Sequence, residues 1–260
     1  MLEPLRDKNS IDRVTTNFFI AQRFPKPDHL LDKLANSEYF RKYTKKTIKK
    51  SDNIDVRDNS VNINTDVVDG FYMEEFDSFG RLDNLFLLQV EPNRTRITIE
   101  NRHYSGWTDY IDMVYSDLFH FQKETKIDLY LQGIQLSYID EFNWTNEKTN
   151  IECKDVFRKD SDLLSKSFLK AHNGASISMS QHKKEDFINE QKVEIVLNND
   201  VRKIVINFIE AFQFNDLKII ENSEQMRTPF KELLDKAHDN NKLILKEILT
   251  DSNLQKINLI

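Results

Sequence analysis

Residues 85–101 read LFLLQVEPNRTRITIEN, and this stretch decides the fold. Both of its ends are rich in the β-branched and large apolar residues that favour strands, and the segment PNR at 92–94 is a turn signal between them. In the second run, Thr95, Ile97 and Ile99 alternate with polar residues, so one face of this strand is predicted to be buried. The stretch therefore predicts an antiparallel hairpin with one polar face.

A helix signal follows this hairpin directly along the chain. Between residues 104 and 124, apolar residues recur at three- and four-residue spacing, which places them on one stripe of an α-helix. The stripe consists of Trp107, Tyr110, Ile111, Val114, Tyr115 and Leu118. Because its aromatic members share the stripe with aliphatic ones, we predict that it packs in the core, with Ser105 as the helix N-cap.

The second half of the chain repeats the hairpin and the long helix. Residues 192–197 and 201–212 flank an Asn-Asn-Asp turn, and the first of these runs alternates apolar and polar residues. A second apolar stripe begins after Thr228, the predicted N-cap, and runs to about residue 249. Pro229 occupies its first helical position, where a missing N–H costs no hydrogen bond. This half is therefore predicted to fold in the same order.

A strand and a shorter helix are predicted ahead of each hairpin. Residues 13–24 alternate as an opening strand, and a helical stretch begins at Asp28. In the second half, residues 127–142 form a long predicted strand and residues 154–170 a predicted helix. The long strand is predicted to place on one face Tyr130, Ile134, Leu136 and Tyr138. Each half thus reads strand, helix, antiparallel strands and long helix.

This repeated order predicts an α+β fold with an internal pseudo-duplication. The two halves, residues 1–126 and 127–260, are expected to form one continuous globular unit. Their antiparallel strands would join into a sheet, and the long helices would cover one face of it. The order of elements in each half resembles the repeat of the TATA-box-binding-protein-like fold, and this resemblance concerns topology alone.

A sheet that helices cover on one face leaves its other face available to a partner. The uncovered face is predicted to carry Arg96, Thr98, Glu100, Lys192 and Glu194. A DNA-binding saddle is basic and inserts apolar wedges, whereas this face mixes charges of both signs. We therefore predict recognition of a protein or a small ligand. Tyr138 and Asp140, at the end of the long strand, are predicted as further binding residues.

The composition excludes several classes of protein. The 260 residues include 37 Lys and Arg against 43 Asp and Glu, a net charge of −6, which argues against a general polyanion binder. Five glycines are too few for the glycine-rich loops of nucleotide enzymes, and no Walker-type, dinucleotide, Gly-x-Ser-x-Gly or His-Glu-x-x-His motif is present. The sequence therefore favours a non-catalytic protein without a cofactor.

The compartment is predicted from the cysteine content and the termini. Cys153 is the only cysteine, so no intrachain disulfide can form, and the first residues lack the apolar core of a signal peptide. The longest apolar runs are far shorter than the ~18 residues that a membrane-spanning helix needs. We expect a cytoplasmic protein that does not enter a membrane.

Short segments spread along the chain carry a family resemblance. They are LLQV at 87–90 with RTRI at 94–97, the helix around Tyr104 and Tyr110, LSYID at 136–140, and LDKAH at 234–238 running into ILT at 248–250. Together they resemble a sporadically distributed family of uncharacterised bacterial proteins of about this length, over residues 11–250. Where that family tends to have Asn, this sequence has Asp140. The resemblance implies no established activity, and the patchy distribution implies a toxin–antitoxin or phage-defence context.

An enzymatic alternative rests on Asp140, Glu152 and Lys154. A hydrophobic residue followed by Glu-x-Lys, with an acid upstream, resembles the core of metal-dependent nucleases, in which two carboxylates hold Mg²⁺ and the lysine stabilises charge. That core needs its Glu-x-Lys on a buried strand, whereas here a polar segment precedes it and a predicted helix follows. A solvated loop is the favoured interpretation, with the Mg²⁺-dependent nuclease as the alternative.

A second alternative is nucleic-acid binding through the basic run 41–50. Its cationic residues are Arg41, Lys42, Lys45, Lys46, Lys49 and Lys50, and it contains no acid. These side chains could follow phosphates, with Tyr43 stacking on a base. Because runs of like charge usually face solvent, a solvated helix end or loop is the favoured interpretation.

No metal site is predicted. The pair His120 and Glu124, and the cluster Asp235, His238 and Asp239, lie at helical spacing. Each set offers about two ligands, but a zinc site needs three or four. We interpret both sets as surface helix pairs. The sequence thus predicts a non-catalytic binding module with a protein partner, no metal and no cofactor, and it leaves the oligomeric state open.

Overall fold

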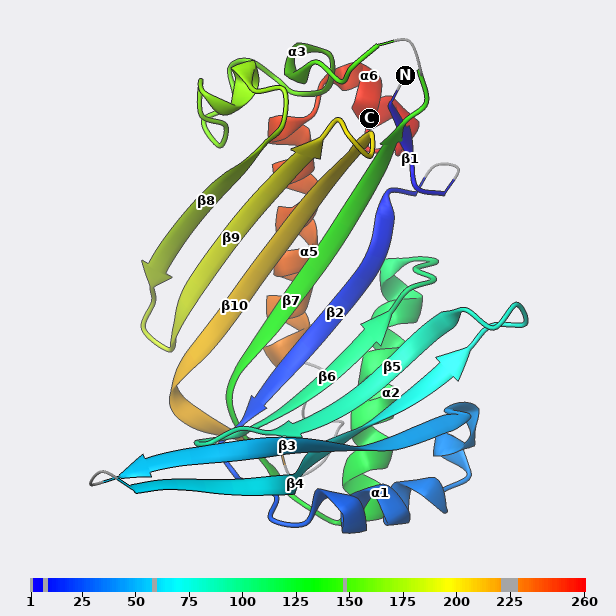
Figure 1. Cartoon of the computed structure of the whole chain (residues 1–260), viewed down its shortest axis with the longest axis vertical. Helices are drawn as coiled ribbons and strands as arrows, with labels where there is room; N and C mark the ends of the chain where they lie inside the picture. The colour runs from blue at the N-terminus through cyan, green and yellow to red at the C-terminus, as the bar shows by residue number, and fades with distance from the viewer. Residues whose placement is uncertain (1, 7–8, 58–59, 147–148, 221–228) are drawn as a thin grey trace.

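The alternating strands of the sequence pair into one antiparallel sheet. The computed structural model describes residues 2–6, 9–57, 60–146, 149–220 and 229–260. The strands are β1 (Leu2–Pro4), β2 (Ile11–Ile20), β3 (Lys45–Arg57), β4 (Ser60–Phe76), β5 (Leu82–Val90), β6 (Thr95–Asn101), β7 (Leu129–Trp144), β8 (Gly174–Lys183), β9 (Phe187–Asn198) and β10 (Lys203–Ile220). They form a ten-stranded sheet in the order β3-β4-β5-β6-β2-β7-β10-β9-β8, with β1 beside β7 (Figure 1).

Helices make the fold α+β, as predicted. They are α1 (Pro27–Ala35), α2 (Trp107–Thr125), α3 (Cys153–Val156), α5 (Pro229–Ile248) and α6 (Asp251–Lys256), with 3-10 turns η1 (Tyr39–Lys42) and η2 (Phe168–Lys170). The long helices α2 and α5 lie behind the sheet in the view of Figure 1, and both cover the same face of it. Among the helices described, none has both the length and the apolar character that crossing a bilayer requires.

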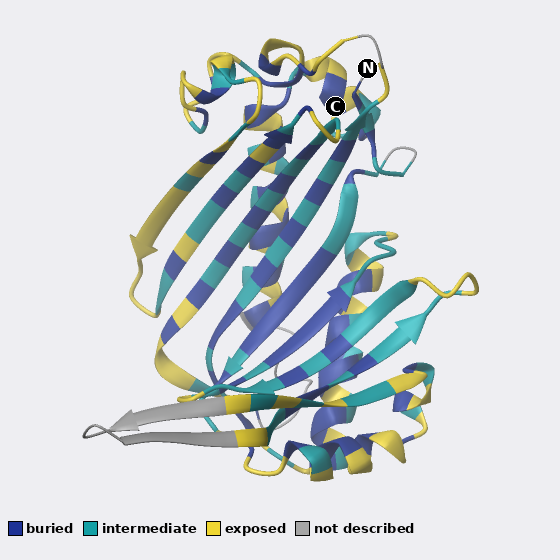
Figure 2. Ribbon diagram, in the orientation of Figure 1, coloured by how far each residue is buried: buried dark blue, intermediate teal, exposed yellow. Residues whose placement is uncertain are grey.

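The core lies between the sheet and the two long helices. Phe18, Ile97 and Ile134 are neighbours across β2, β6 and β7, and all three are fully buried. The apolar stripe of α2 is buried from Tyr110 to Leu118, which confirms its prediction. Each such side chain contributes roughly 1.5–3 kcal/mol on burial. The same pattern appears as the dark-blue central strands of Figure 2.

The two central strands each pair with a later strand that precedes a long helix. β2 lies beside β6 and β7 lies beside β10, and β2 and β7 meet in antiparallel orientation at the middle of the sheet. The predicted hairpins are confirmed as β5–β6 and β9–β10. α2 follows β6 and α5 follows β10 along the chain.

The helix predicted over residues 154–170 is wrong. After the single turn of α3, Phe157 forms a β-bridge with Leu249, and the backbone N–H of Arg158 donates to the carbonyl oxygen of Ile248. The C-terminal end of α5 thus supplies hydrogen bonds that a longer helix would have made within itself. Phe157 and Leu164 are buried without a regular helix, and Phe168 is buried in the 3-10 turn η2.

No side chain caps the N-terminus of α2. Gly106 is the N-cap residue, and the hydroxyl of Ser105 lies 2.8 Å from Oδ2 of Asp109. The predicted cap at Ser105 is therefore wrong, because this hydroxyl donates to an acid of the first turn and accepts no backbone N–H. α5 begins at Pro229 as predicted, while its predicted cap Thr228 lies outside the described residues.

A β-bulge in β7 places Tyr130 and Ile134 on opposite faces, contrary to the predicted alternation. The register of β7 against β2 shifts here, and Gly133 and Ile134 are buried in succession. Leu129 and Leu131 therefore face the core in place of Tyr130, which is only half-buried.

Gly133 also allows β7 to approach β10 closely, which gives a first prediction. A Cβ atom at this position would lie 2.5 Å from the carbonyl oxygen of Phe212. Because that oxygen belongs to a paired strand, Gly133→Ala should destabilise the protein by about 1–3 kcal/mol in urea unfolding. Gly106→Ser is the control, since a Cβ there meets no atom within 4 Å. Equal stability of the two variants would contradict the close approach.

Candidate binding sites

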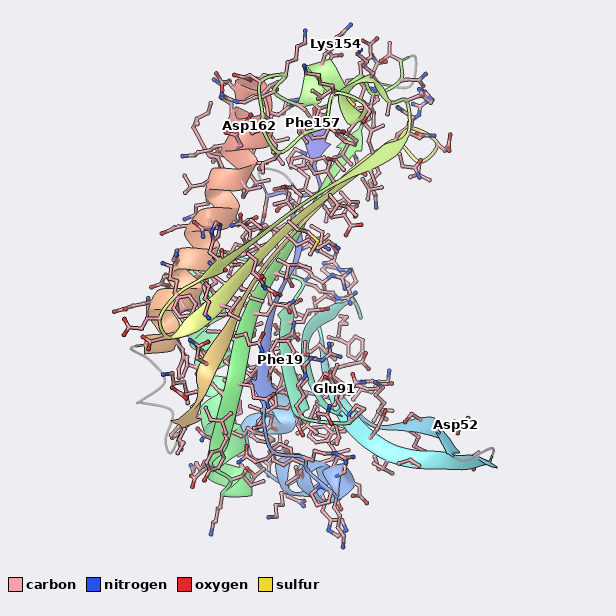
Figure 3. All side chains as sticks on the ribbon, turned by 90° about the vertical axis from the view of Figure 1, so that its left-hand side faces the viewer. Phe19, Asp52, Glu91, Lys154, Phe157 and Asp162 are labelled. Carbon is pink, nitrogen blue, oxygen red and sulfur yellow. The ribbon has the colours of Figure 1, made fainter. Side chains whose placement is uncertain are left out.

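The sheet face turned away from α2 and α5 is the first candidate, and we call it the open face. Across the strands, Glu74, Leu85, Glu100, Thr15, Ser137, Ile209, Lys192 and Met179 lie directly opposite one another in one row. They alternate along their strands with the buried residues of the core. In Figure 3, Glu91 marks this side of the sheet, and α5 lies on the other side.

The centre of the open face is less accessible than the sequence predicts. Thr98 and Glu100 are both buried, and the Thr98 hydroxyl donates to Oδ1 of Asn17 at 2.6 Å. Arg102 and Arg13 lie 2.7 and 3.7 Å from the Glu100 carboxylate. The centre of this face is therefore a satisfied polar network.

Most cations of the open face are matched by carboxylates of the same face. Lys192 lies 2.9 Å from Glu194, and Lys203 lies 2.6 Å from Glu141. Arg96, the remaining predicted residue, donates to Gln89 at 2.7 Å and lies 3.4 Å from Glu91. These pairs leave little unmatched positive charge, so phosphate binding is not favoured on this face.

The accessible apolar surface of the open face lies at its β8 end. Ile177 and Met179 of β8 are 57% and 74% exposed, and the neighbouring Val196 of β9 is 37% exposed. Ile177 lies opposite Glu194, and Met179 lies opposite Lys192. Because directly opposite residues share a face of the sheet, these apolar side chains adjoin the Lys192–Glu194 pair. We call Ile177, Met179, Val196, Lys192 and Glu194 the edge patch.

The basic run 41–50 is divided between η1 and β3, and its cations do not form one groove. Lys45 lies 2.6 Å from Glu74, and Lys50 lies 3.4 Å from Asp66. Lys46 donates to the carbonyl oxygen of its neighbour Tyr43. Arg41 lies on η1, whereas Lys49 lies on β3. Successive lysines of a strand also point to opposite faces.

Tyr43 is not available to a nucleic-acid base. It is fully buried, and its hydroxyl donates to Oδ2 of Asp117 at 2.5 Å. Lys42 of the same run donates to Oδ1 of Asp117 at 2.8 Å. The predicted stacking role of Tyr43 is therefore wrong, because the residue anchors the segment after α1 to α2.

Tyr138 and Asp140 lie on the helix face of β7, not on the open face. They share this face with the buried Leu136 and are themselves fully buried. Asp140 lines a cavity of about 730 Å³ between the start of β2, the segment before α2, and α5. Residues of this cavity include Ser10, Tyr104, Trp107, Asp140, His238 and Asn241, and we call it the Asp140 cavity. The predicted binding residues thus separate into two sites on opposite faces.

Asp140 has one satisfied and one unsatisfied carboxylate oxygen. Oδ1 accepts a hydrogen bond of 2.6 Å from the Ser10 hydroxyl. Oδ2 is buried and has no hydrogen-bond partner among the described residues. Burial raises the pKa of Asp140 to about 6, although the hydrogen bond from the Ser10 hydroxyl opposes this rise. The carboxylate is therefore mostly ionised at neutral pH.

His238 is a buried member of this cavity, so its interpretation as part of a surface pair was wrong. Its Nδ1 lies 2.8 Å from the Tyr138 hydroxyl, and its ring stacks on Trp107 with 4.5 Å between centroids. Trp107 in turn donates to Asp235 at 2.7 Å. Burial lowers the pKa of His238 to about 4, so the imidazole is neutral at pH 7.

The sequence did contain a signal for this histidine. His238 is spaced by four residues from Leu234, by three from Asn241 and by seven from Leu245, and all four are buried. That spacing is the inward stripe of an amphipathic helix. Asn241 was not predicted as a site residue, although it occupies the same stripe.

Asp140, Glu152 and Lys154 do not form a nuclease centre. Glu152 and Lys154 are more than half exposed, pair with each other, and line a different cavity from Asp140. Lys154 lies at one end of the molecule in Figure 3. The Glu-x-Lys segment opens α3, whereas the chemistry needs it on a buried strand. In the described parts of the chain, no three His, Cys, Asp or Glu side chains are grouped to hold a metal ion.

His120 and Glu124 are also engaged separately. The His120 ring stacks on Tyr39 with 3.8 Å between centroids, and Glu124 accepts a hydrogen bond of 3.0 Å from the Ser37 hydroxyl. Both contacts join α2 to the segment after α1, so their role is in packing.

The chain was compared with protein-family models, with curated proteins and with solved structures, and none of them matches it. No activity is therefore transferred to it from a relative.

Proposed function

We propose that this protein is a non-catalytic binding module that recognises another polypeptide through the open face, at the edge patch. The observation that carries the proposal is the exposure of Ile177 and Met179 on the outer strand of the sheet. An outer strand presents a row of unpaired backbone N–H and C=O groups, which a second extended chain can join.

The two outer strands of this sheet differ in how they are protected against pairing. β3 carries four lysines between residues 45 and 50, and charge of this kind keeps other strands away. β8 carries no charged residue between 174 and 181. In Figure 2 most of β8 is exposed. Pairing is therefore favoured at β8 and disfavoured at β3.

The chemistry of the edge patch suits a peptide strand better than a nucleic acid. Backbone hydrogen bonds to β8 would supply affinity, and alternate side chains of the partner would meet Ile177 and Met179. The Lys192–Glu194 ion pair lies next to these apolar side chains and supplies one positive and one negative charge. A partner with apolar residues at alternate positions, flanked by polar ones, is complementary to this arrangement.

The internal duplication is part of the same proposal. It is supported by the pairing of β2 with β6 and of β7 with β10, each followed by a long helix. This arrangement resembles the TATA-box-binding-protein-like fold, with helices on one face and recognition on the other. The toxin–antitoxin or phage-defence context belongs to the proposal through the family resemblance alone, and the neighbouring genes on the chromosome test it.

The experiment compares wild type with the double variant Ile177→Lys/Met179→Lys. Both side chains are exposed, so the fold should persist, while buried lysines should weaken partner binding by about tenfold or more. The matched control is Leu243→Lys, an equally exposed change on α5 on the other side of the sheet. Each protein is immobilised and exposed to extract of the source organism, and affinities are then measured by calorimetry with the purified partner.

The proposal expects a polypeptide that wild type and Leu243→Lys retain and the double variant loses. The partner could be a second copy of this chain, and sedimentation of the purified proteins tests this case. A dimer that is lost only in the double variant would identify the partner as a second copy. A partner bound with equal affinity by all three proteins would contradict recognition at the edge patch.

A further inference from the structure

We infer that the Asp140 cavity is a binding site for a small molecule that presents a primary ammonium group to Asp140 and Asn241. This site lies on the helix face of the sheet and is independent of the edge patch. It therefore adds a second ligand to a protein whose proposed partner binds on the opposite face.

Two unsatisfied acceptors determine the chemistry of this ligand. Oδ2 of Asp140 and Oδ1 of Asn241 are both buried, and neither has a hydrogen-bond partner among the described residues. Asp140 is 0% and Asn241 2% exposed, and both line the cavity. A buried acceptor without a donor is costly, and an ionised carboxylate is the most costly of all. An ammonium group carries three donors, no acceptor and the matching charge.

The surroundings hold the carboxylate in place. The Ser10 hydroxyl fixes Oδ1, and the carbonyl oxygen of Ser10 accepts the backbone N–H of Glu141 at 2.7 Å. Asn9 donates to the carbonyl oxygen of Tyr104 at 2.8 Å, which joins the start of β2 to the segment before α2. A binding group that is already ordered loses little entropy when its ligand arrives.

The rest of the cavity suits a carbon body attached to the ammonium group. Its volume of about 730 Å³ falls within the range of roughly 300–1,000 Å³ that small-molecule sites occupy. Trp107 and Tyr104 form an aromatic wall, and Leu245 and Ile257 are apolar. Two cations, Arg6 and Lys242, also line the cavity, and they donate to the carbonyl oxygen of Arg102 and to Asp239 respectively. The fit is therefore to an alkyl or arylalkyl primary amine.

Calorimetry with matched probes tests the inference. The probes are methylamine, butylamine and benzylamine, with benzyltrimethylammonium as a cation without N–H donors and benzyl alcohol as a donor without charge. Wild type should bind at least one primary amine. The two benzyl controls should bind more weakly than benzylamine by about tenfold or more.

Two variants assign the binding to the two acceptors. Asp140→Asn keeps the size of the side chain and removes its charge, and Asn241→Leu removes the second acceptor. Each should reduce amine affinity by about tenfold or more, while thermal unfolding shows that the variant remains folded. Since Asp140 must be ionised, affinity in wild type should rise on the order of tenfold per pH unit below about pH 6. Asp140→Asn should lack this pH dependence.

Lys8→Ala is a third variant in this experiment. Lys8 is included because it is close to Ser10 in the sequence and lies outside the described residues. Unchanged amine affinity in Lys8→Ala is the expected result. Amine binding that appears only in Lys8→Ala would show that the chain's own lysine satisfies Asp140, and would overturn the inference. Failure of all three primary amines to bind wild type at millimolar concentration would also overturn it, as would equal binding by Asp140→Asn.

Discussion

Replacing Asp117 with alanine is expected to destabilise this protein by about 3–5 kcal/mol. Asp117 lies on α2 and is fully buried. Its carboxylate accepts hydrogen bonds from Tyr39 at 2.7 Å, from Lys42 at 2.8 Å and from Tyr43 at 2.5 Å. Alanine would leave these donors without their acceptor, and the Tyr43 hydroxyl would remain buried.

The charge of Asp117 also keeps its tyrosine partners protonated. Burial, followed by the charge of Asp117, raises the pKa of Tyr43 well above its ordinary value, and the same two causes raise the pKa of Tyr39. Both phenols are therefore protonated donors at neutral pH and well above it. Asp117→Asn should fall between wild type and Asp117→Ala, because the amide retains one acceptor oxygen.

Urea unfolding measures this effect, with Asp112→Ala as the matched control. Asp112 lies on the same helix but is exposed, so its replacement should change the free energy of unfolding by less than about 0.5 kcal/mol. A loss below about 1 kcal/mol in Asp117→Ala would mean that this carboxylate does not anchor the basic segment to α2.

The second large effect is a pair of opposite pH dependences in Asp140→Asn and His238→Gln. His238 has a folded pKa of about 4, below its ordinary 6.5, so only the unfolded chain takes up a proton between these values. Its contribution to stability is lost as the pH falls from about 6.5 to 4. Asp140 has a folded pKa of about 6, above its ordinary 3.8. Its contribution is present below about pH 3.8 and is lost as the pH rises through 6.

The shifted pKa values of Asp140 and His238 each change the free energy of unfolding by about 3 kcal/mol, and in wild type these two changes oppose one another between pH 4 and 6. A variant that lacks one of the two groups should therefore show the pH dependence of the other. Relative to wild type, Asp140→Asn should gain about 3 kcal/mol of unfolding free energy as the pH rises from 4 to 6.5, and His238→Gln should lose about as much over the same range.

Urea unfolding of the three proteins at half-unit pH steps measures the two slopes. Subtracting the wild-type free energy of unfolding from that of each variant cancels the contributions of the carboxylates that all three proteins share. Three parallel curves would show that neither Asp140 nor His238 titrates from a buried, shifted state.

Local periodicity explains what could be predicted from the sequence. The hairpins at 85–101 and 192–212 and the long helices rest on residues within a few positions of each other, and these elements are confirmed. The position of Asp140 followed from the same rule, because Tyr138 and Asp140 lie two and four residues after Leu136 and so share its buried face. Their alternation with Leu136 therefore places both side chains in the core, where they are not exposed ligands.

Contacts between distant segments explain what could not be predicted. Residues 156–158, at the start of the loop at 154–170, take backbone partners from residues 248–250, and Tyr43 meets Asp117 across 74 positions. No pattern within either segment contains these partners. The close approach of Gly133 to the carbonyl oxygen of Phe212 likewise joins two strands that are far apart in the sequence.

Amide hydrogen exchange of β8 tests the proposed function most directly. In an outer strand of an antiparallel sheet, alternate backbone N–H groups point away from the sheet and exchange readily with solvent. In the complex with the polypeptide partner, amides of residues 174–183 should exchange much more slowly than in the free protein, while those of β3 should be unchanged. A stable complex in which the β8 amides exchange as fast as in the free protein would contradict the account.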